Sequence, residues 1–86
     1  MGRRRGQLEI LVDVLEIALV GVRVTHLMYR ANLSYSTLRR YLRMALDRGL
    51  ICRVDGDDGS VVYRTTGKGK ELLAKLKDVL GSCMSV

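Results

Sequence analysis

Apolar side chains recur at helical spacing near the start of the chain. Glu9, Asp13 and Glu16 fall on the opposite side, so the pattern predicts an amphipathic helix over residues 8–20, with Gly21 placed to end it. The main apolar stripe consists of Leu8, Leu11, Leu15 and Leu19, with a second flank of Ile10, Val14 and Ile17. This helix therefore carries more apolar surface than a single contact needs.

Two shorter helices are predicted in the middle of the chain. Thr25 is a suitable N-cap for a helix over residues 26–31, and Ser34 for a second helix that reaches about Arg48. Gly49 follows at the position where a left-handed residue commonly ends a helix. Because only three or four residues separate the two helices, they predict a helix-turn-helix.

The remaining pattern is typical of short strands and a final helix. Residues 22–24 alternate and predict a very short strand, while residues 50–54 and 61–65 flank the turn sequence DGDDGS, which indicates a hairpin. Thr66 can cap a last helix that runs through Leu80. The order of helix, short strand, helix, helix, β-hairpin and helix predicts an α+β, mainly α fold: the winged helix-turn-helix.

The amino-acid composition predicts a small aliphatic core and a strongly basic surface. The 86 residues carry 15 Lys and Arg against 9 Asp and Glu, a net charge of +6. Phe, Trp and Pro are absent, so we expect an aliphatic core in which the four tyrosines supply the only rings. Small domains of this kind often gain stability by dimerising. Arg outnumbers Lys 11 to 4, which favours bidentate recognition of phosphate or guanine over a generic basic surface.

Several other chemistries are not expected. Cys52 and Cys83 lie far apart and only one His is present, so no zinc site can be assembled and both thiols are predicted to be free. The GKGK sequence at residues 67–70 lacks the spacing of a phosphate-binding loop. No catalytic arrangement is found, and we predict neither an enzyme nor a cofactor. Acidic residues interrupt the apolar run after MGRRRG, which predicts no membrane span, no export signal and a cytoplasmic protein.

Three blocks of the sequence carry a family resemblance. The first block contains a Thr-capped helix that leads into MYRANLSY; it covers residues 23–51 (RVTHLMYRANLSYSTLRRYLRMALDRGLI). The second contains a Y-x-x-T-x-K-G motif and covers residues 62–73 (VYRTTGKGKELL). Residues 3–19 add a basic start followed by an amphipathic helix. These blocks resemble the small archaeal winged-helix DNA-binding proteins and predicted transcriptional regulators, several of which dimerise through the helix after the wing. The resemblance implies DNA binding in an archaeal cytoplasm. The chain departs from the family in its acidic wing tip and its short last helix.

Residues 34–48 form the candidate recognition helix. Its apolar face is predicted to hold Leu38, Leu42, Ala45 and Leu46. The far side carries arginines and no acid through residue 46, whereas an ordinary surface helix usually mixes charges. We interpret this side as a DNA-reading surface on which Arg40 and Arg43 reach guanine edges or phosphates in the major groove. Met44 is placed there too, either as a contact for a thymine methyl group or as an idle exposed side chain.

The other candidate DNA contacts surround this helix. Small hydroxyl residues at its start have the length needed where a helix N-terminus approaches DNA, and neighbouring cations are expected to bind the backbone. The hydroxyl residues are Ser34, Ser36 and Thr37, and the cations are Arg30, Arg39, Arg53 and Arg64. Phosphate would repel Asp55, Asp57 and Asp58, so the wing tip is expected to point away from DNA or to face a basic partner.

We expect three segments along the chain. Residues 1–7 form a basic arm, residues 8–66 the winged helix-turn-helix domain, and residues 67–86 the C-terminal helix. The arginines of the arm, Arg3, Arg4 and Arg5, either contact phosphates or the minor groove, or belong to a disordered tail.

The C-terminal helix is also a candidate dimerisation element. Its spacing resembles an a/d seam at Leu72, Leu76, Val79 and Cys83, to which Ile10, Val14 and Ile17 could add. Simple packing of this helix on the core is the alternative.

The leading hypothesis is a homodimeric, sequence-specific double-stranded DNA-binding protein that regulates transcription. Each copy would place residues 34–48 in one of two successive major grooves. A sequence-tolerant nucleoid protein is the first alternative. A winged-helix protein-interaction module, whose arginine face meets an acidic partner, is the second.

Overall fold

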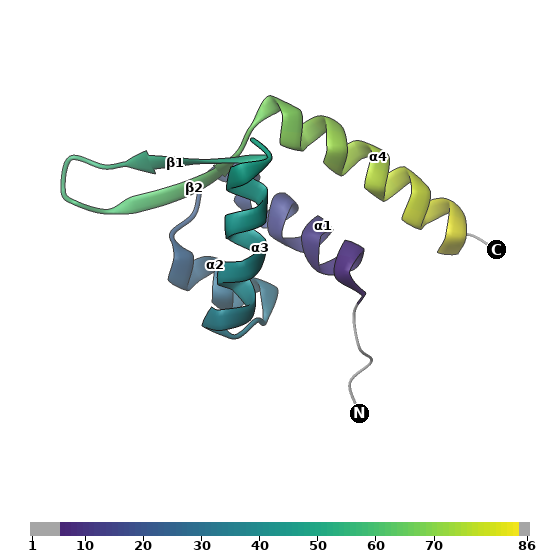
Figure 1. Ribbon diagram of the computed structural model, residues 1–86, viewed down its shortest axis with the longest axis horizontal. Coiled ribbons are helices and arrows are strands. Elements are labelled where there is room, and N and C mark those ends of the chain that lie inside the picture. Colours follow the sequence, from purple (N-terminus) through teal and green to yellow (C-terminus); the bar gives the residue numbers. More distant parts are fainter. Residues whose placement is uncertain (1–5, 85–86) are drawn as a thin grey trace.

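The hairpin and the C-terminal helix extend in opposite directions from the end of the helix labelled α3 (Figure 1). The computed structural model describes residues 6–84, with side chains as far as residue 80. The elements are α1 (Gln7–Ile17), a 3-10 turn η1 (Ala18–Val20), α2 (Val24–Ala31), α3 (Tyr35–Asp47), β1 (Ile51–Asp55), β2 (Val61–Thr65) and α4 (Gly67–Met84). The predicted winged helix-turn-helix arrangement is confirmed.

The core is aliphatic, as the composition predicts, but the tyrosines are distributed differently. Leu15, Leu27 and Leu38 are fully buried and join α1, α2 and α3. Tyr29 is 85% exposed and Tyr35 is 52% exposed, so the prediction that all tyrosines supply core rings is wrong. Leucine, isoleucine and valine already fill the interior between the helices, and these two rings lie on outer helix surfaces.

The rotation of α3 differs from the helical-wheel prediction at two positions. Met44, predicted on the outer side, packs against the core, while Leu46, predicted in the core, is 37% exposed. The reason lies in the neighbours of the helix. Gln7 at the start of α1 lies beside Met44, whereas an open groove separates Leu46 from the hairpin. Met44 therefore lies on the core side of α3, and Leu46 lies on its groove side.

The predicted strand at residues 22–24 is reduced to a single bridge. The backbone N–H of Val22 donates to the carbonyl of Tyr63 at 3.0 Å, and the N–H of Tyr63 donates back at 2.8 Å. This pairing keeps the chain extended through Arg23, so α2 begins at Val24. The predicted N-cap at Thr25 is therefore wrong: Arg23 occupies that position without a capping side-chain bond.

The turn between α2 and α3 follows the prediction. Asn32 adopts a left-handed conformation, with φ of 56°, which this residue type tolerates better than most. The Oγ of Ser34 accepts a hydrogen bond from the backbone N–H of Thr37 at 3.3 Å, which confirms the N-cap of α3. Gly49 has φ of 72°, so the predicted left-handed end of this helix is confirmed.

A joint of short hydrogen bonds fixes the start of α4. The Thr66 hydroxyl donates to the carbonyl of Gly49 at 2.6 Å and accepts from the N–H of Gly69 at 3.1 Å, which confirms the predicted cap. The Thr66 N–H donates to the Leu50 carbonyl at 2.9 Å. A Cβ on Gly69 would overlap that carbonyl oxygen, so only Gly lets α4 lie against the chain there.

The far end of α4 lies beyond the predicted limit of Leu80. The helix continues to Met84 because a single Gly such as Gly81 costs only about 1 kcal/mol in a helix. In residues 6–84, no helix is both long and apolar enough to cross a bilayer.

Candidate nucleic-acid interface

The outer side of α3 carries a row of exposed arginines. Leu38, Leu42 and Ala45 are buried and anchor the helix, which leaves the opposite side to solvent. Arg39, Arg40 and Arg43 are exposed on α3, and Arg48 is exposed directly after the helix ends. Four cations within ten residues repel one another, and this arrangement is stabilised when phosphate lies among them.

Among the described residues, no acidic side chain forms an ion pair with these arginines. Across the part of the chain that the structure describes, none of the four forms an ion pair, and the i,i+4 pair open to Arg43 and Asp47 is not made. The ion pairs that do form join Arg23 to Asp58 at 3.9 Å, Arg53 to Asp55 at 3.1 Å and Lys77 to Glu16 at 2.6 Å. The positive charge of α3 is therefore available to an external anion.

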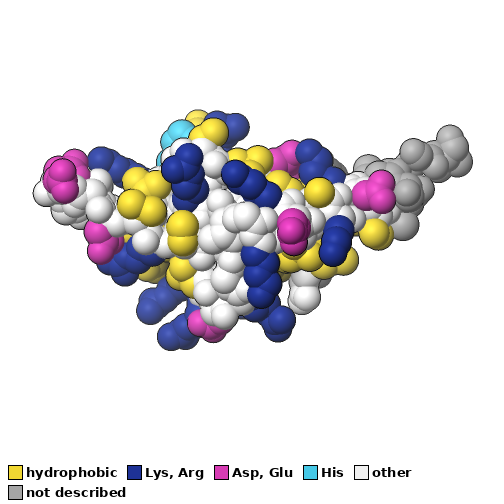
Figure 2. Space-filling model, turned by 90° about the horizontal axis from the view of Figure 1, so that it is seen from above, with side chains coloured by type: hydrophobic (Ala, Val, Ile, Leu, Met, Phe, Trp, Pro, Cys, Tyr) yellow, Lys and Arg dark blue, Asp and Glu magenta, His cyan; other side chains and the backbone are white. Residues whose placement is uncertain are grey.

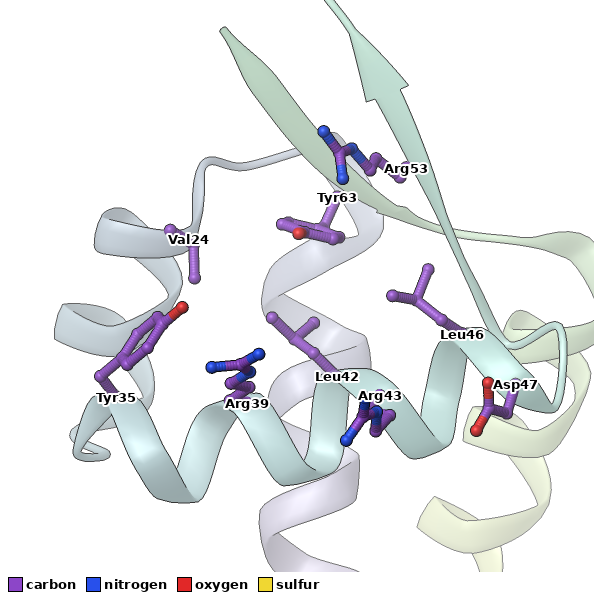
Figure 3. Close-up of a pocket in the computed structure, with 9 residues that line it drawn as sticks. All are labelled: Val24, Tyr35, Arg39, Leu42, Arg43, Leu46, Asp47, Arg53 and Tyr63. Atoms are coloured by element: carbon purple, nitrogen blue, oxygen red, sulfur yellow. The ribbon is translucent and has the colours of Figure 1, made fainter.

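A groove of about 480 Å³ runs between α3 and the hairpin (Figure 3). Figure 3 shows Arg39 pointing from α3 toward the hairpin, where Arg53 and Tyr63 lie, and Arg43 lying across α3. The lining residues are Val24, Tyr35, Arg39, Leu42, Arg43, Leu46, Asp47, Arg53 and Tyr63. Apolar side chains and cations therefore line the same groove, as a sugar-phosphate strand would require.

Sequence reasoning missed the two tyrosines of this groove. Tyr35 lies in the first turn of α3, at the side of the groove formed by α2, and Tyr63 projects from β2. Both rings present a hydroxyl group that can donate to a phosphate. The available signal was the position of Tyr35 directly after the Ser34 cap, at the exposed start of the helix.

The hydroxyl residues at the start of α3 have different surroundings. Ser34 Oγ accepts from the Thr37 N–H and donates to Thr37 Oγ1 at 3.0 Å, so this hydroxyl group is engaged in capping. Thr37 is half-buried, whereas Ser36 is exposed. A hollow lined by Ser36 together with Arg39 and Arg40 lies beside it. Of the three hydroxyl residues, Ser36 is thus the most open to a ligand.

The two arginines of the hairpin lie on opposite faces. Arg53 pairs with Tyr63 in the antiparallel register, and Arg64 pairs with Cys52. Because alternate residues of a strand point to opposite faces, Arg64 lies on the face away from the groove that Arg53 lines. The structure brings Arg53 to the arginines of α3 but not Arg64.

The wing tip remains acidic and ordered by local hydrogen bonds. The hydroxyl and backbone N–H of Ser60 donate to Asp58 Oδ1 at 2.6 Å and 3.1 Å, and they hold the pKa of Asp58 below its ordinary value. Figure 2 shows acidic side chains gathered at the end of the hairpin, away from most of the Lys and Arg side chains. Asp58 is therefore negatively charged at neutral pH.

The remaining predicted site residues lie outside this groove or outside the described part. Arg30 is exposed in the last turn of α2, away from the groove lining. Leu72 and Leu76 are half-buried against the core, and Val79 is 55% exposed. Arg3, Arg4, Arg5 and the side chain of Cys83 fall outside the described residues. Among the described side chains, no cluster of His, Cys, Asp and Glu is suited to a metal ion.

Comparisons with known proteins agree with this geometry. The sequence model of a family described as winged helix-turn-helix matches residues 4–82. An uncharacterized protein of Methanocaldococcus jannaschii is 34% identical over 77 residues, which cover 88% of this chain. The matched region spans only 34% of that relative's length, so the relative is a much longer protein.

Solved structures share the fold over most of the chain. Sso10a-2, a DNA-binding protein from Sulfolobus solfataricus, superposes with a TM-score of 0.79 at 26% identity, covering 88% of this chain and 79% of that one. The transcriptional regulator BldR from Sulfolobus solfataricus also gives 0.79, at 18% identity, and covers 86% of this chain and 55% of its own. The second likeness is one of fold alone.

Proposed function

The chain belongs to the winged helix-turn-helix family, and from that premise we propose that it binds double-stranded DNA as a transcriptional regulator, with α3 as its recognition helix. The observation that carries the proposal is the row of exposed arginines on α3, which form no ion pair within the described residues. Sso10a-2 is a DNA-binding protein, and its likeness to this chain at 26% identity supports the proposal. The proposed role requires no catalytic step.

The groove geometry suggests how the contacts divide. Arg40 and Arg43 stand on the outer side of α3 and are assigned to base edges or phosphates in the major groove. Arg39 and Arg53 line the groove between α3 and the hairpin and are assigned to one phosphate strand. Ser36 is the hydroxyl assigned to a contact at the helix start. Arg64, on the opposite face of the hairpin, has no part in this surface.

Dimerisation is proposed through α4, but with a smaller apolar contribution than the sequence pattern suggests. Val79 is 55% exposed and is the described member of the seam that is most open to a second copy. Leu72 and Leu76 also pack on the protein's own core, so each offers only part of its surface. Val14 is fully buried and therefore adds nothing to such an interface. Two copies joined in this way would present two α3 helices to successive major grooves.

The test is duplex binding over a salt series, with wild type compared with Arg40→Ala/Arg43→Ala. Each phosphate contact contributes about 0.9 to the slope of log affinity against log salt, so the variant slope should be shallower by about two if both arginines bind phosphate. The control is Lys70→Ala/Lys77→Ala, which removes two positive charges from exposed positions on α4. It should leave the slope close to that of wild type.

Three outcomes separate the competing functions. If Arg40→Ala/Arg43→Ala binds with wild-type affinity and slope, α3 is not the recognition helix. If wild type binds all duplexes equally, the protein is sequence-tolerant and a nucleoid role replaces regulation. Weak binding that does not change with salt would favour an acidic protein partner instead.

A further inference from the structure

A second basic hollow lies where the end of α3 meets the first turns of α4. Its volume is about 360 Å³, smaller than that of the groove beside the hairpin. It is lined by Arg48, Leu50, Lys68, Glu71, Leu72 and Lys75. Leu50 is buried and Leu72 half-buried, so these two residues form an apolar floor beneath exposed charged side chains. None of these residues was assigned to DNA from the sequence.

The charge of this hollow is positive and unpaired. Arg48, Lys68 and Lys75 are exposed, and none of them has an ion-pair partner within residues 6–80. Glu71 is the single acid in the lining, which leaves a local charge of +2 from three cations and one carboxylate. Lys77 on the same helix differs from these three cations, because it forms an ion pair with Glu16 of α1 at 2.6 Å.

This hollow is continuous with the arginine surface of α3. Arg48 lines it and also lines the shallow hollow that contains Arg40 and Arg43. A ligand lying along α3 therefore meets further cations when it passes the start of α4.

We infer that the hollow formed by Arg48, Lys68 and Lys75 binds the phosphate backbone of duplex DNA next to the stretch read by α3. Lys68 and Lys75 are two helical turns apart, about 10 Å along α4. That length corresponds to about three nucleotide steps of one strand, at a rise of about 3.4 Å each along the duplex axis. This inference rests on the proposed DNA-binding function and extends its surface.

The test uses two variants of the full chain that change opposite sides of α4, one of which also loses the exposed ion pair between Lys77 and Glu16. Lys68→Ala/Lys75→Ala removes two of the three cations of the hollow and leaves Arg48. Lys70→Ala/Lys77→Ala removes two cations with the same spacing from the other side of the helix. Affinity is measured from about 50 to 200 mM salt, and loss of two phosphate contacts should reduce the salt-induced weakening by about tenfold. Ethylation interference then locates the phosphates that each variant no longer contacts.

We expect the shallower slope only for Lys68→Ala/Lys75→Ala, together with loss of phosphates that flank those lost in Arg40→Ala/Arg43→Ala. Lys68→Arg/Lys75→Arg keeps the charge and should keep the wild-type slope. The inference is overturned if both lysine pairs behave alike while Arg40→Ala/Arg43→Ala still weakens binding. If the arginine variant also binds like wild type, the proposed function itself has failed, and the two failures are thus distinguishable.

Discussion

Replacing Gly69 by Ala tests the joint between the hairpin and α4. A Cβ at this position would overlap the Leu50 carbonyl oxygen and lie 2.7 Å from Cγ2 of Thr65. One of these neighbours is backbone, so no side-chain rotation can relieve the overlap. The start of α4 must move away from Leu50, and the hydrogen bond from the Thr66 N–H to that carbonyl, now 2.9 Å, must lengthen.

The opposing contributions can be compared. Overpacking costs about 1–3 kcal/mol, and weakening the Thr66 hydrogen bond costs about 1 kcal/mol more. The better helix propensity of Ala returns about 1 kcal/mol. The free energy of unfolding should fall by about 1–3 kcal/mol. At about 4–8 °C for each kcal/mol, the midpoint of thermal unfolding should fall by about 4–24 °C. Folded domains have a free energy of unfolding of about 0.05–0.15 kcal/mol per residue, so this loss is a large fraction of the stability of a small domain.

Gly67→Ala provides the matched control in the same helix. Nothing lies within 4 Å of a Cβ built there, so the substitution should be neutral or stabilising by up to about 1 kcal/mol. Thermal and urea unfolding, followed by far-ultraviolet circular dichroism, would measure both variants. If Gly69→Ala is as stable as wild type, or if both variants shift equally, the close approach of α4 to Leu50 does not determine the choice of Gly.

Three further outcomes follow from individual contacts. Ser34→Ala removes the N-cap of α3 and should lower the free energy of unfolding by about 1 kcal/mol in urea titrations; an unchanged midpoint would contradict the cap. Asp55→Asn releases Arg53 from its 3.1 Å ion pair and should strengthen duplex binding by at most about fivefold, because exposed pairs contribute no more than about 1 kcal/mol; weaker binding in fluorescence anisotropy would refute this. Ser60→Ala removes the main cause of the lowered pKa of Asp58, so that pKa should rise in an NMR titration. A lowered pKa in the folded state stabilises the fold at pH values above the unfolded-state pKa. That stabilisation disappears as the pH falls through the folded-state pKa, so the free energy of unfolding of the variant should depend less on pH in this acidic range.

Local signals in the sequence were sufficient for much of the fold. Ser34 and Gly49 mark the two ends of α3 because capping depends on nearby backbone groups and not on the rest of the molecule. The DG-rich turn that residues 50–54 and 61–65 flank likewise identifies β1 and β2. The start of α2 could not be predicted in this way, because it depends on the pairing of Val22 with Tyr63. That pairing joins residues far apart in the chain.

The candidate site was less accessible to sequence reasoning. A helical wheel identifies the two sides of α3 but not which flank a neighbouring helix covers, and so Met44 and Leu46 were exchanged. The opposite facing of Arg53 and Arg64 depends on the register of the hairpin. The ion pair between Arg53 and Asp55 requires side-chain geometry. The hollow beside α4 combines residues that follow α3 with residues of α4 itself, which no local pattern groups together.

The joint at Thr66 and Gly69 has a consequence for operator architecture. In a dimer formed through α4, the angle between α3 and α4 determines how far apart the two recognition helices lie. Thr66 and Gly69 set that angle, since they hold the start of α4 against Gly49 and Leu50. A substitution there would alter the number of base pairs between the half-sites that the dimer accepts, although no DNA-facing side chain had changed. The contact between the start of α4 and Leu50 would therefore determine the half-site spacing. That spacing could change without any change in the bases that the recognition helices read.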